Sequence, residues 1–180
     1  NSDEIFFYSE GFLNEILDEL KILKLQNLSN PTGNDFKTRL KTLMGKNLNE
    51  EKFQEIVSLK DDNFKSRIID QFNNNRIERT KILGSEQAKE IEKRILLQSI
   101  DLNWKSHIQY LEQLRQVIGL RSYGQRDPLI EYKKEAFDLF SNLFEKLKLD
   151  YITILMNLKV VEQQSEMINS NKNIDKPNNP

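Results

Sequence analysis

The sequence predicts an all-α fold, with short helices before residue 84 followed by a long antiparallel two-helix finger. Charged residues make up 31% of the 180 residues and hydrophobic residues 37%, which is typical of amphipathic helices exposed on most faces. Apolar residues recur every three or four positions in several segments, which is the period of one helical face. Neither Pro nor Gly interrupts residues 85–118, so a single helix can occupy that stretch.

The first helix is predicted over residues 11–25, where apolar residues follow each other at steps of four, four and three. Its apolar face consists of Phe12, Ile16, Leu20 and Leu23. Residues 27–34 are rich in Asn, Ser, Pro and Gly, which favour turns. We therefore expect a loop there.

Three shorter helices should follow before residue 84. Asp35 is expected to cap a helix that Gly45 ends, and another helix should begin near Asn49. Residues 62–83 have a less regular apolar spacing, broken by an asparagine run at 73–75 that we interpret as compositional drift. The apolar positions of these helices are Phe36, Leu40 and Leu43, then Phe53, Ile56 and Val57, then Phe64, Ile68, Phe72 and Ile77.

A domain boundary is predicted between Gly84 and Ser85. Ser85 is expected to cap a long helix that reaches Ile118, because its hydroxyl can accept from amides of the first turn. Apolar residues three or four apart should form one stripe that faces a partner along the whole helix. The stripe consists of Leu97, Ile100, Trp104, Ile108, Leu111, Leu114 and Ile118.

A second long helix should begin after Asp127, a good N-cap residue, with Pro128 at the first helical position. Its apolar stripe has the spacing of a heptad seam and consists of Phe137, Phe140, Phe144, Leu147, Tyr151, Ile154 and Leu158. The two stripes match in length, so the helices should fold back antiparallel with residues 120–126 exposed at the turn. Residues 163–180 have little to bury and are expected to be a disordered tail.

The composition excludes most kinds of active site. The chain contains no Cys, which rules out disulfides, thiolate nucleophiles and Cys-ligated zinc, and His107 alone cannot form a multi-histidine metal site. No phosphate-binding loop of the G-x-x-x-x-G-K-[ST] type occurs. We therefore predict no catalytic residue, no metal site and no cofactor, and we expect His107 and Trp104 to serve in packing.

The charge balance and the apolar runs also limit the partners and the location. With 27 basic against 28 acidic residues, the chain is not a general nucleic-acid binder. No apolar run is long enough to span a bilayer or to serve as a signal peptide, so the chain is expected to be cytosolic. Because it begins with Asn rather than Met, we expect it to be a piece of a longer protein.

The predicted turn carries the residues best suited to contact other molecules: Tyr123, Arg121, Gln125 and Arg126. An exposed Tyr with flanking Arg and amide groups can contact varied polypeptides. Equally compatible with the composition is a structural role, in which Tyr123 packs on the helix ends and the arginines cap carbonyl groups. Binding of lipid or nucleic-acid phosphates by Arg121, Arg126 and Arg115 is less favoured, because acidic residues follow. These are Asp127, Glu131 and Glu135.

Two segments of the long helices resemble the carboxy-terminal part of the SecA family, the motors of bacterial preprotein export. These are RILLQSIDLNWKSH (94–107) and LRQVIGLRSYGQRDPLIEYKKEAF (114–137). The resemblance is strong over about residues 90–160, whereas the first 84 residues match by position and helical character. Ser122 and Ala136 stand where the family commonly has Gly, and residues 105–107 replace a typical Arg-Glu-His.

The resemblance implies a helical wing domain at 1–84, a helical scaffold domain with the two-helix finger at 85–162, and a linker tail at 163–180. Tyr123 then matches the fingertip residue that contacts the translocating preprotein at the mouth of the SecYEG channel. The family's ATP and Mg sites lie in domains outside this chain, so this fragment is not itself an enzyme. The cysteine-rich zinc segment that ends many family members is not in this sequence.

The same resemblance implies several partners for the parent protein: the preprotein, SecYEG, the other SecA domains and, in addition, anionic lipid. It places the parent at the cytoplasmic face of the inner membrane. Two alternatives remain open from the residues alone. One is a freestanding helical adaptor or coiled-coil chaperone that binds polypeptide partners, and the other is a lipid-surface binder that uses the arginines of the turn.

Overall fold

The computed structural model describes residues 2–29, 34–60, 63–120 and 127–160, and every regular element in these ranges is a helix. The prediction of an all-α fold is therefore confirmed. The helices are α1 (Ser2–Ser29), α2 (Asp35–Met44), α3 (Glu50–Ser58), α4 (Asn63–Leu83), α5 (Ser85–Ile118) and α6 (Pro128–Asn157), with a 3-10 turn, η1, at Gly45–Asn47.

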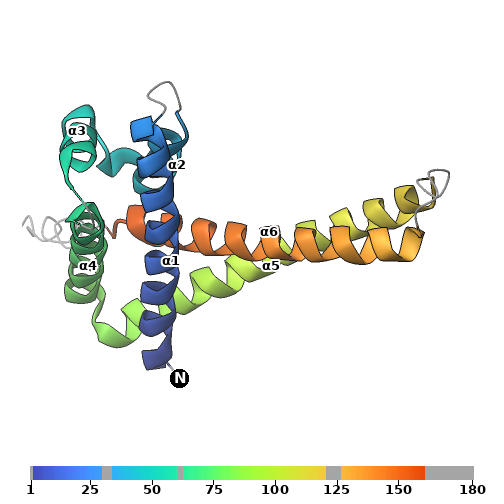
Figure 1. The fold of residues 1–180 in the computed structure, drawn as a ribbon. Coiled ribbons are helices and arrows are strands. Elements are labelled where there is room, and N and C mark those ends of the chain that lie inside the picture. Colours follow the sequence, from blue (N-terminus) through green and yellow to red (C-terminus); the bar gives the residue numbers. More distant parts are fainter. Residues whose placement is uncertain (1, 30–33, 61–62, 121–126, 161–180) are drawn as a thin grey trace, which may run out of the picture.

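The molecule consists of a compact group of helices and a long projection. We call α1–α4 the base helices and the paired α5 and α6 the helix arm (Figure 1). In the arm, α5 and α6 pack against each other and run in opposite directions, and they separate toward the base. The base helices α1 and α4 pack on both arm helices, so the arm is held from two sides.

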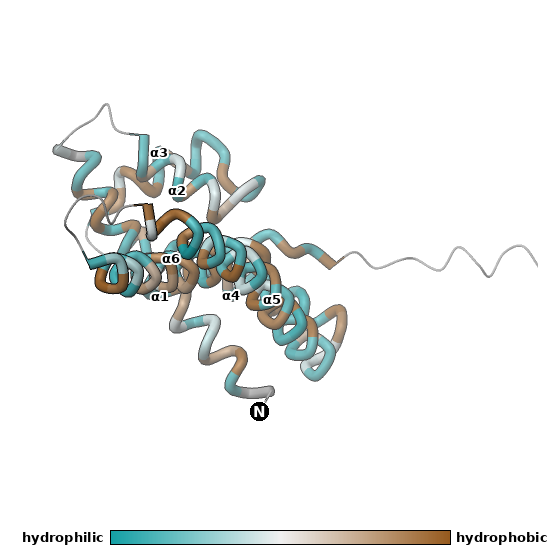
Figure 2. Tube along the Cα trace, turned by 90° about the vertical axis from the view of Figure 1, so that its right-hand side faces the viewer, coloured by the Kyte–Doolittle hydropathy of each residue, from teal (hydrophilic) through white to brown (hydrophobic). Residues whose placement is uncertain are grey.

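The hydrophobic core lies where the end of α6 enters the base helices. Apolar and polar residues alternate along each helix, as the brown and teal segments in Figure 2 show. Because α6 contributes to the core, the arm and the base fold around shared apolar contacts. The fully enclosed side chains of the core include Leu17 and Leu20 of α1, Phe36 and Leu40 of α2, Phe64 and Phe72 of α4, and Tyr151, Ile152 and Leu155 of α6.

Several predicted helix boundaries require correction. Helix α1 begins at Ser2 and continues to Ser29, so residues 27–29 are helical rather than part of the expected loop. Asp35 and Ser85 are the first helical residues of α2 and α5, and neither is the N-cap; Asn34 and Gly84 precede them without a side-chain capping bond. A carboxylate within the first turn still favours the positive end of the helix dipole. The predicted tail at 163–180 lies outside the described residues.

The predicted N-cap at Asp127 is confirmed, and Asn49, near which a helix was expected to begin, also proves to be an N-cap. The Asn49 side chain accepts a hydrogen bond from the backbone amide of Lys52 at 2.8 Å, and α3 begins directly after it. The Asp127 side chain accepts from the amide of Leu129 at 2.9 Å, with Pro128 in the first turn of α6. Each side chain satisfies one of the amides that a helix start leaves without an intrahelical partner.

The predicted contact stripes of the two long helices are wrong over part of their length. In α5, the stripe residues Leu97, Ile100, Trp104 and Ile108 are exposed, and the buried face there carries Ser99, Asn103 and His107 instead. Nearer the tip, Leu114 and Ile118 are buried as predicted. In α6, Phe137, Phe140, Phe144 and Ile154 are exposed, whereas Leu147 and Tyr151 are buried as expected. In α5 the buried positions precede exposed stripe positions by one residue, a rotation of about 100° around the helix axis. Tertiary contacts described below select this orientation.

Among the glycines that the structure describes, Gly45 is the one at which a side chain would be most disruptive. Its φ of 52° lies in the left-handed region, and a Cβ atom there would stand 2.4 Å from Oδ1 of Asn157. We predict that Gly45→Ala lowers the free energy of unfolding by about 1–3 kcal/mol, through backbone strain and displacement of the Asn157 amide. Urea unfolding of the chain measures this loss.

The matched control for this prediction is Gly11→Ala. Gly11 lies inside α1, and no heavy atom is within 4 Å of a Cβ placed there. Alanine should stabilise this position by roughly 0.5–1 kcal/mol, because it has the higher helix propensity. Equal effects of the two substitutions would contradict the strained conformation assigned to Gly45.

Candidate functional site

The residues predicted to contact other molecules follow the far end of the arm. Helix α5 ends at Ile118 and α6 begins at Pro128, and both ends lie at the tip of the projection, away from the base helices (Figure 1). Tyr123, Arg121, Gln125 and Arg126 lie between these ends and are outside the described residues. Their exposure and contacts therefore stay predictions.

The described residues next to this segment show a surface with both apolar and charged groups. Leu120, Leu129 and Ile130 are exposed. Arg115 binds the Glu112 carboxylate at 2.9 Å, and this hydrogen bond holds the pKa of Glu112 below its ordinary value. The Arg115 guanidinium thus has a neighbouring acidic partner within α5, which weakens the case for phosphate binding by this residue.

Asp127 fixes the start of α6 at the tip. We predict that Asp127→Ala lowers the free energy of unfolding by about 1 kcal/mol, because the amide of Leu129 loses its capping partner. Amide hydrogen exchange should show the loss in the first turn of α6. Asp138→Ala, at an exposed interior position of the same helix, is the control and should have no such effect. Unchanged protection in the Asp127 variant would contradict the capping role.

The middle of the arm has a polar contact between its two helices. The Asn103 amide nitrogen donates to the Ser99 carbonyl oxygen at 2.9 Å and to Oδ2 of Asp150 in α6 at 3.2 Å. Next to this contact, His107 is buried between the rings of Trp104 and Phe140, with ring centroids 5.5 and 6.1 Å away. These contacts turn the polar face of α5 toward α6 in the middle of the arm and leave the apolar stripe exposed there, from Leu97 to Ile108.

The base of the arm contains a buried ion cluster, formed by Arg76 and Arg79 of α4 and Glu92 of α5. The Arg76 Nε and Nη2 atoms donate to Oε1 and Oε2 of Glu92 at 3.0 and 2.9 Å, and Arg79 Nη2 donates to Oε1 at 3.0 Å. Arg76 also contacts Ser9 and Glu10 of α1. A buried carboxylate with two arginines is stable only because its charge is compensated.

The carbonyl end of α6 is held by side chains of the base helices. Arg79 Nη1 donates to the Leu155 carbonyl oxygen at 2.9 Å, and the Asn75 amide donates to that of Met156 at 2.7 Å. The Asn47 amide donates to the Met156 carbonyl as well, at 3.3 Å. The last carbonyl groups of a helix have no intrahelical partner, so these bonds replace a local cap with a tertiary one.

A second contact joins the arm to α1. The buried Lys148 ammonium group of α6 binds Glu15 of α1 and Glu145 one turn earlier. Burial lowers the pKa of Lys148, but the hydrogen bonds to the two carboxylates outweigh burial and raise it above its ordinary value. Phe12 of α1 packs edge-on against Phe144, with centroids 6.3 Å apart. Helix α1 thus braces the arm near its base.

Tyr151 of α6 lies in the same buried region. Burial and, to a smaller extent, the negative charge of Glu92 raise the pKa of the Tyr151 hydroxyl above its ordinary value. The phenol is therefore neutral under ordinary conditions and contributes an apolar ring to the core, where it contacts Phe12 edge-on.

Neither the ion cluster nor the role of the asparagine run was predicted from the sequence. Arg76 and Arg79 continue the buried face of α4 after Phe72, at steps of four and three, so arginines on an apolar face were the signal. Buried arginines require an acidic partner. Asn75 makes a specific bond to the end of α6, which the interpretation as compositional drift does not explain.

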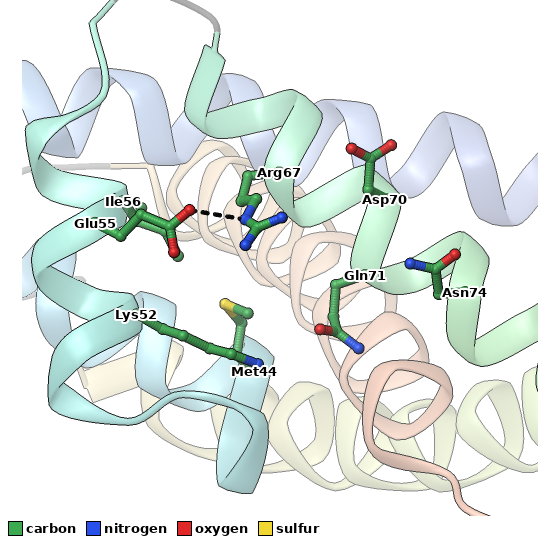
Figure 3. A pocket seen from close by; sticks show the side chains of 8 residues that line it. All are labelled: Met44, Lys52, Glu55, Ile56, Arg67, Asp70, Gln71 and Asn74. Carbon is green, nitrogen blue, oxygen red and sulfur yellow. Dashed lines mark ion pairs between the residues drawn. The ribbon is translucent and has the colours of Figure 1, made fainter.

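A small cleft between α3 and α4 offers no better site. Figure 3 shows Arg67 and Glu55 pointing toward one another across it, with Nε and Oε1 3.0 Å apart. Its volume of about 80 Å³ is well below that of ordinary small-molecule sites. Within the described ranges, no cluster of His, Asp and Glu is arranged to hold a metal ion. None of the described helices has the length and apolarity needed to cross a membrane.

The geometry defines a class of protein: a group of short helices carrying a long antiparallel helix pair. The same class emerges from comparison with known families, because residues 4–159 match the model of the SecA Wing and Scaffold domain. The chain belongs to the SecA family.

Individual relatives agree with this assignment. The protein translocase subunit SecA of Pelagibacter ubique is 57% identical over all 180 residues, which cover 100% of this chain and 21% of the relative. SecA of Caulobacter vibrioides is 39% identical over 72% of this chain and 14% of the relative, and SecA of Helicobacter acinonychis is 34% identical over 86% and 17%. The chain thus spans about a fifth or less of the length of these curated relatives.

Proposed function

We propose that this chain is the wing and scaffold part of a protein translocase motor, in which the helix arm contacts the preprotein at the SecYEG channel. The observation that carries the proposal is the joint ending of α5 and α6 at the tip, away from the base helices. Tyr123, Arg121, Gln125 and Arg126 follow in the sequence at this point, and their composition suits contact with varied polypeptides.

In this proposal the chain is a mechanical and binding element, and ATP hydrolysis with Mg takes place in domains outside it. Two features support a lever. The arm is a packed helix pair, and its inner end shares a hydrophobic core and a buried ion cluster with the base helices. Because packed helices move as a body, motion of the base is transmitted to the tip.

The proposed partners and location follow from the family. The preprotein and SecYEG would meet the tip, and other domains of the longer protein would meet the rest of the molecule. Exposed apolar residues of α5, among them Leu97 and Trp104, support such contacts along the arm. The location would be the cytoplasmic face of the inner membrane, with anionic lipid as a further contact.

Replacing Tyr123 with Ala in the full-length protein tests the proposal. We expect preprotein translocation into SecYEG vesicles to fall about tenfold, the effect of losing a contact of about 1.4 kcal/mol. ATP turnover should stay within about twofold, because the contact is remote from the nucleotide site. Tyr8→Ala, at an exposed tyrosine of α1 and away from the arm, is the matched control and should leave translocation unchanged.

Other outcomes separate the alternatives. Parallel losses in translocation, ATP turnover and thermal stability would show a structural Tyr123 and contradict the proposal. Unchanged translocation, together with tight polypeptide binding by the isolated chain, would favour the freestanding adaptor or coiled-coil chaperone. Retention of the chain on anionic vesicles at low salt, abolished by Ala at Arg121 and Arg126, would favour the lipid-surface binder.

A further inference from the structure

We propose that Arg79 is a positioning residue that sets the angle of the helix arm by holding α5 and α6 at the same time from α4. This inference rests on the proposed function, because the angle matters only if the arm acts as a lever. It concerns a residue far from the tip, at the opposite end of the projection.

The two bonds of Arg79 come from different nitrogens of one guanidinium group. Nη2 donates to Glu92 of α5 at 3.0 Å, and Nη1 donates to the Leu155 carbonyl oxygen of α6 at 2.9 Å. Arg79 is only 2% exposed, so neither bond competes with bulk water. The planar fork of arginine keeps its nitrogens at a fixed separation, and it therefore couples the positions of the two helices.

Each helix that Arg79 holds retains other contacts with the base when Arg79 is removed. Glu92 keeps both of its bonds from Arg76, and the end of α6 keeps the bonds from Asn75 and Asn47 to the Met156 carbonyl oxygen. The substitution therefore removes the shared hold of α4 on both helices, while each of them stays attached to the base and the two still pack on each other along the arm. Loss of positioning can thus be separated from loss of folding.

The length of the arm amplifies a small change at this point. From Glu92 to Ile118 the helix rises about 40 Å, so a tilt of roughly 10° at the cluster moves the tip by about 7 Å. A displacement of this size exceeds the separation of about 4 Å at which the heavy atoms of two side chains are in contact. A loosened base would therefore leave the tip folded but wrongly placed.

The absence of cysteine from the sequence allows the arm angle to be measured directly. Nitroxide labels on Cys introduced at Lys41 of α2 and Lys133 of α6 report the distance between the base and the arm by pulsed electron paramagnetic resonance. A second pair, Lys41 and Gln113, reports on α5. All three positions are exposed.

We expect Arg79→Lys and Arg79→Met to broaden both distance distributions at least twofold while helix content is kept. Lysine is the decisive variant, because a single ammonium group keeps the charge but does not reproduce the fork. Arg67→Met is the control on the same helix, since Arg67 pairs with Glu55 at an exposed site, and it should leave both distributions unchanged.

A wild-type distribution in Arg79→Lys would overturn the proposal, because charge alone would then suffice. Loss of helix content in both Arg79 variants would also overturn it, since Arg79 would then be a folding residue. In the full-length protein, Arg79→Lys should lower translocation at least threefold more than ATP turnover. The label distances do not depend on any transport activity, so failure of the proposed function and failure of the positioning role are distinguishable.

Discussion

Replacing Glu92 with Ala should lower the free energy of unfolding of the chain by about 3–5 kcal/mol, the cost of breaking a buried ion pair on one side. Glu92 is completely buried and accepts hydrogen bonds from both Arg76 and Arg79. Without the carboxylate, two buried guanidinium groups would face each other with no compensating charge. The charge of Glu10, which contacts Arg76 at 3.2 Å, is mostly exposed and compensates little.

Urea unfolding followed by circular dichroism measures this loss. Glu86→Ala is the matched control, because Glu86 lies in the same helix, is 84% exposed and pairs with Lys89 at 3.6 Å. Its substitution should change stability by less than about 0.5 kcal/mol. A loss below about 1 kcal/mol for Glu92→Ala would contradict a closed cluster and would indicate that water enters the base of the arm.

Replacing the whole cluster separates the net contribution of the ion pairs from the cost of leaving a buried charge without a partner. If Arg76, Arg79 and Glu92 are exchanged together for Met, Met and Leu, much of the stability lost in Glu92→Ala should return, because no buried charge remains without a partner. The triple variant should still show the broadened label distances expected for Arg79→Met. The cluster would then contribute more to the placement of the arm than to the net stability.

Local signals in the sequence were sufficient to predict the helices and some of their caps. The predicted cap at Asp127 depends on a side chain and an amide two residues away, so no distant contact is needed to predict it. The start of α1 was missed because contacts from a distant helix help to hold it: Arg76 of α4 lies 4.2 Å from the centroid of the Phe6 ring and donates to the Ser9 hydroxyl. Tertiary packing extends this helix beyond its regular apolar pattern.

The face that each long helix buries was not predictable from its own pattern. Helix α5 carries an apolar stripe next to a polar one, and periodicity alone favours burial of the apolar stripe. The polar stripe is buried because Asn103 reaches Asp150 of α6, a residue 47 positions away. Likewise, Phe144 of α6 packs on Phe12 of α1 instead of the α5 seam.

The residues of the candidate site were likewise only partly predictable from the sequence. Arg76 and Arg79 were visible as arginines on an apolar face, but their partner Glu92 lies on another helix and required the structure. Tyr123 was singled out by composition and by the family resemblance, and the described residues do not test its role. Sequence patterns thus indicate candidate residues, whereas the pairing between helices determines what those residues do.

Adjacent residues near the end of α6 provide the sharpest test of the helix orientation. The apolar stripe predicted from periodicity places Ile154 in the contact, whereas the structure leaves Ile154 44% exposed and buries Leu155 completely. We expect Leu155→Ala to lower the free energy of unfolding by about 2–5 kcal/mol, because it opens a cavity in the core shared by α6 and the base helices.

Ile154→Ala should cost less than about 1 kcal/mol, since the side chain is only partly buried and Ala has the higher helix propensity. The two variants remove the same three side-chain carbon atoms from neighbouring positions, so the difference between them in urea unfolding reports mainly which of the two side chains is buried. The opposite order of stabilities would show that α6 is turned by one residue from the orientation described. The Leu155 carbonyl would then no longer face Arg79, and the proposed positioning of the arm would fail with it.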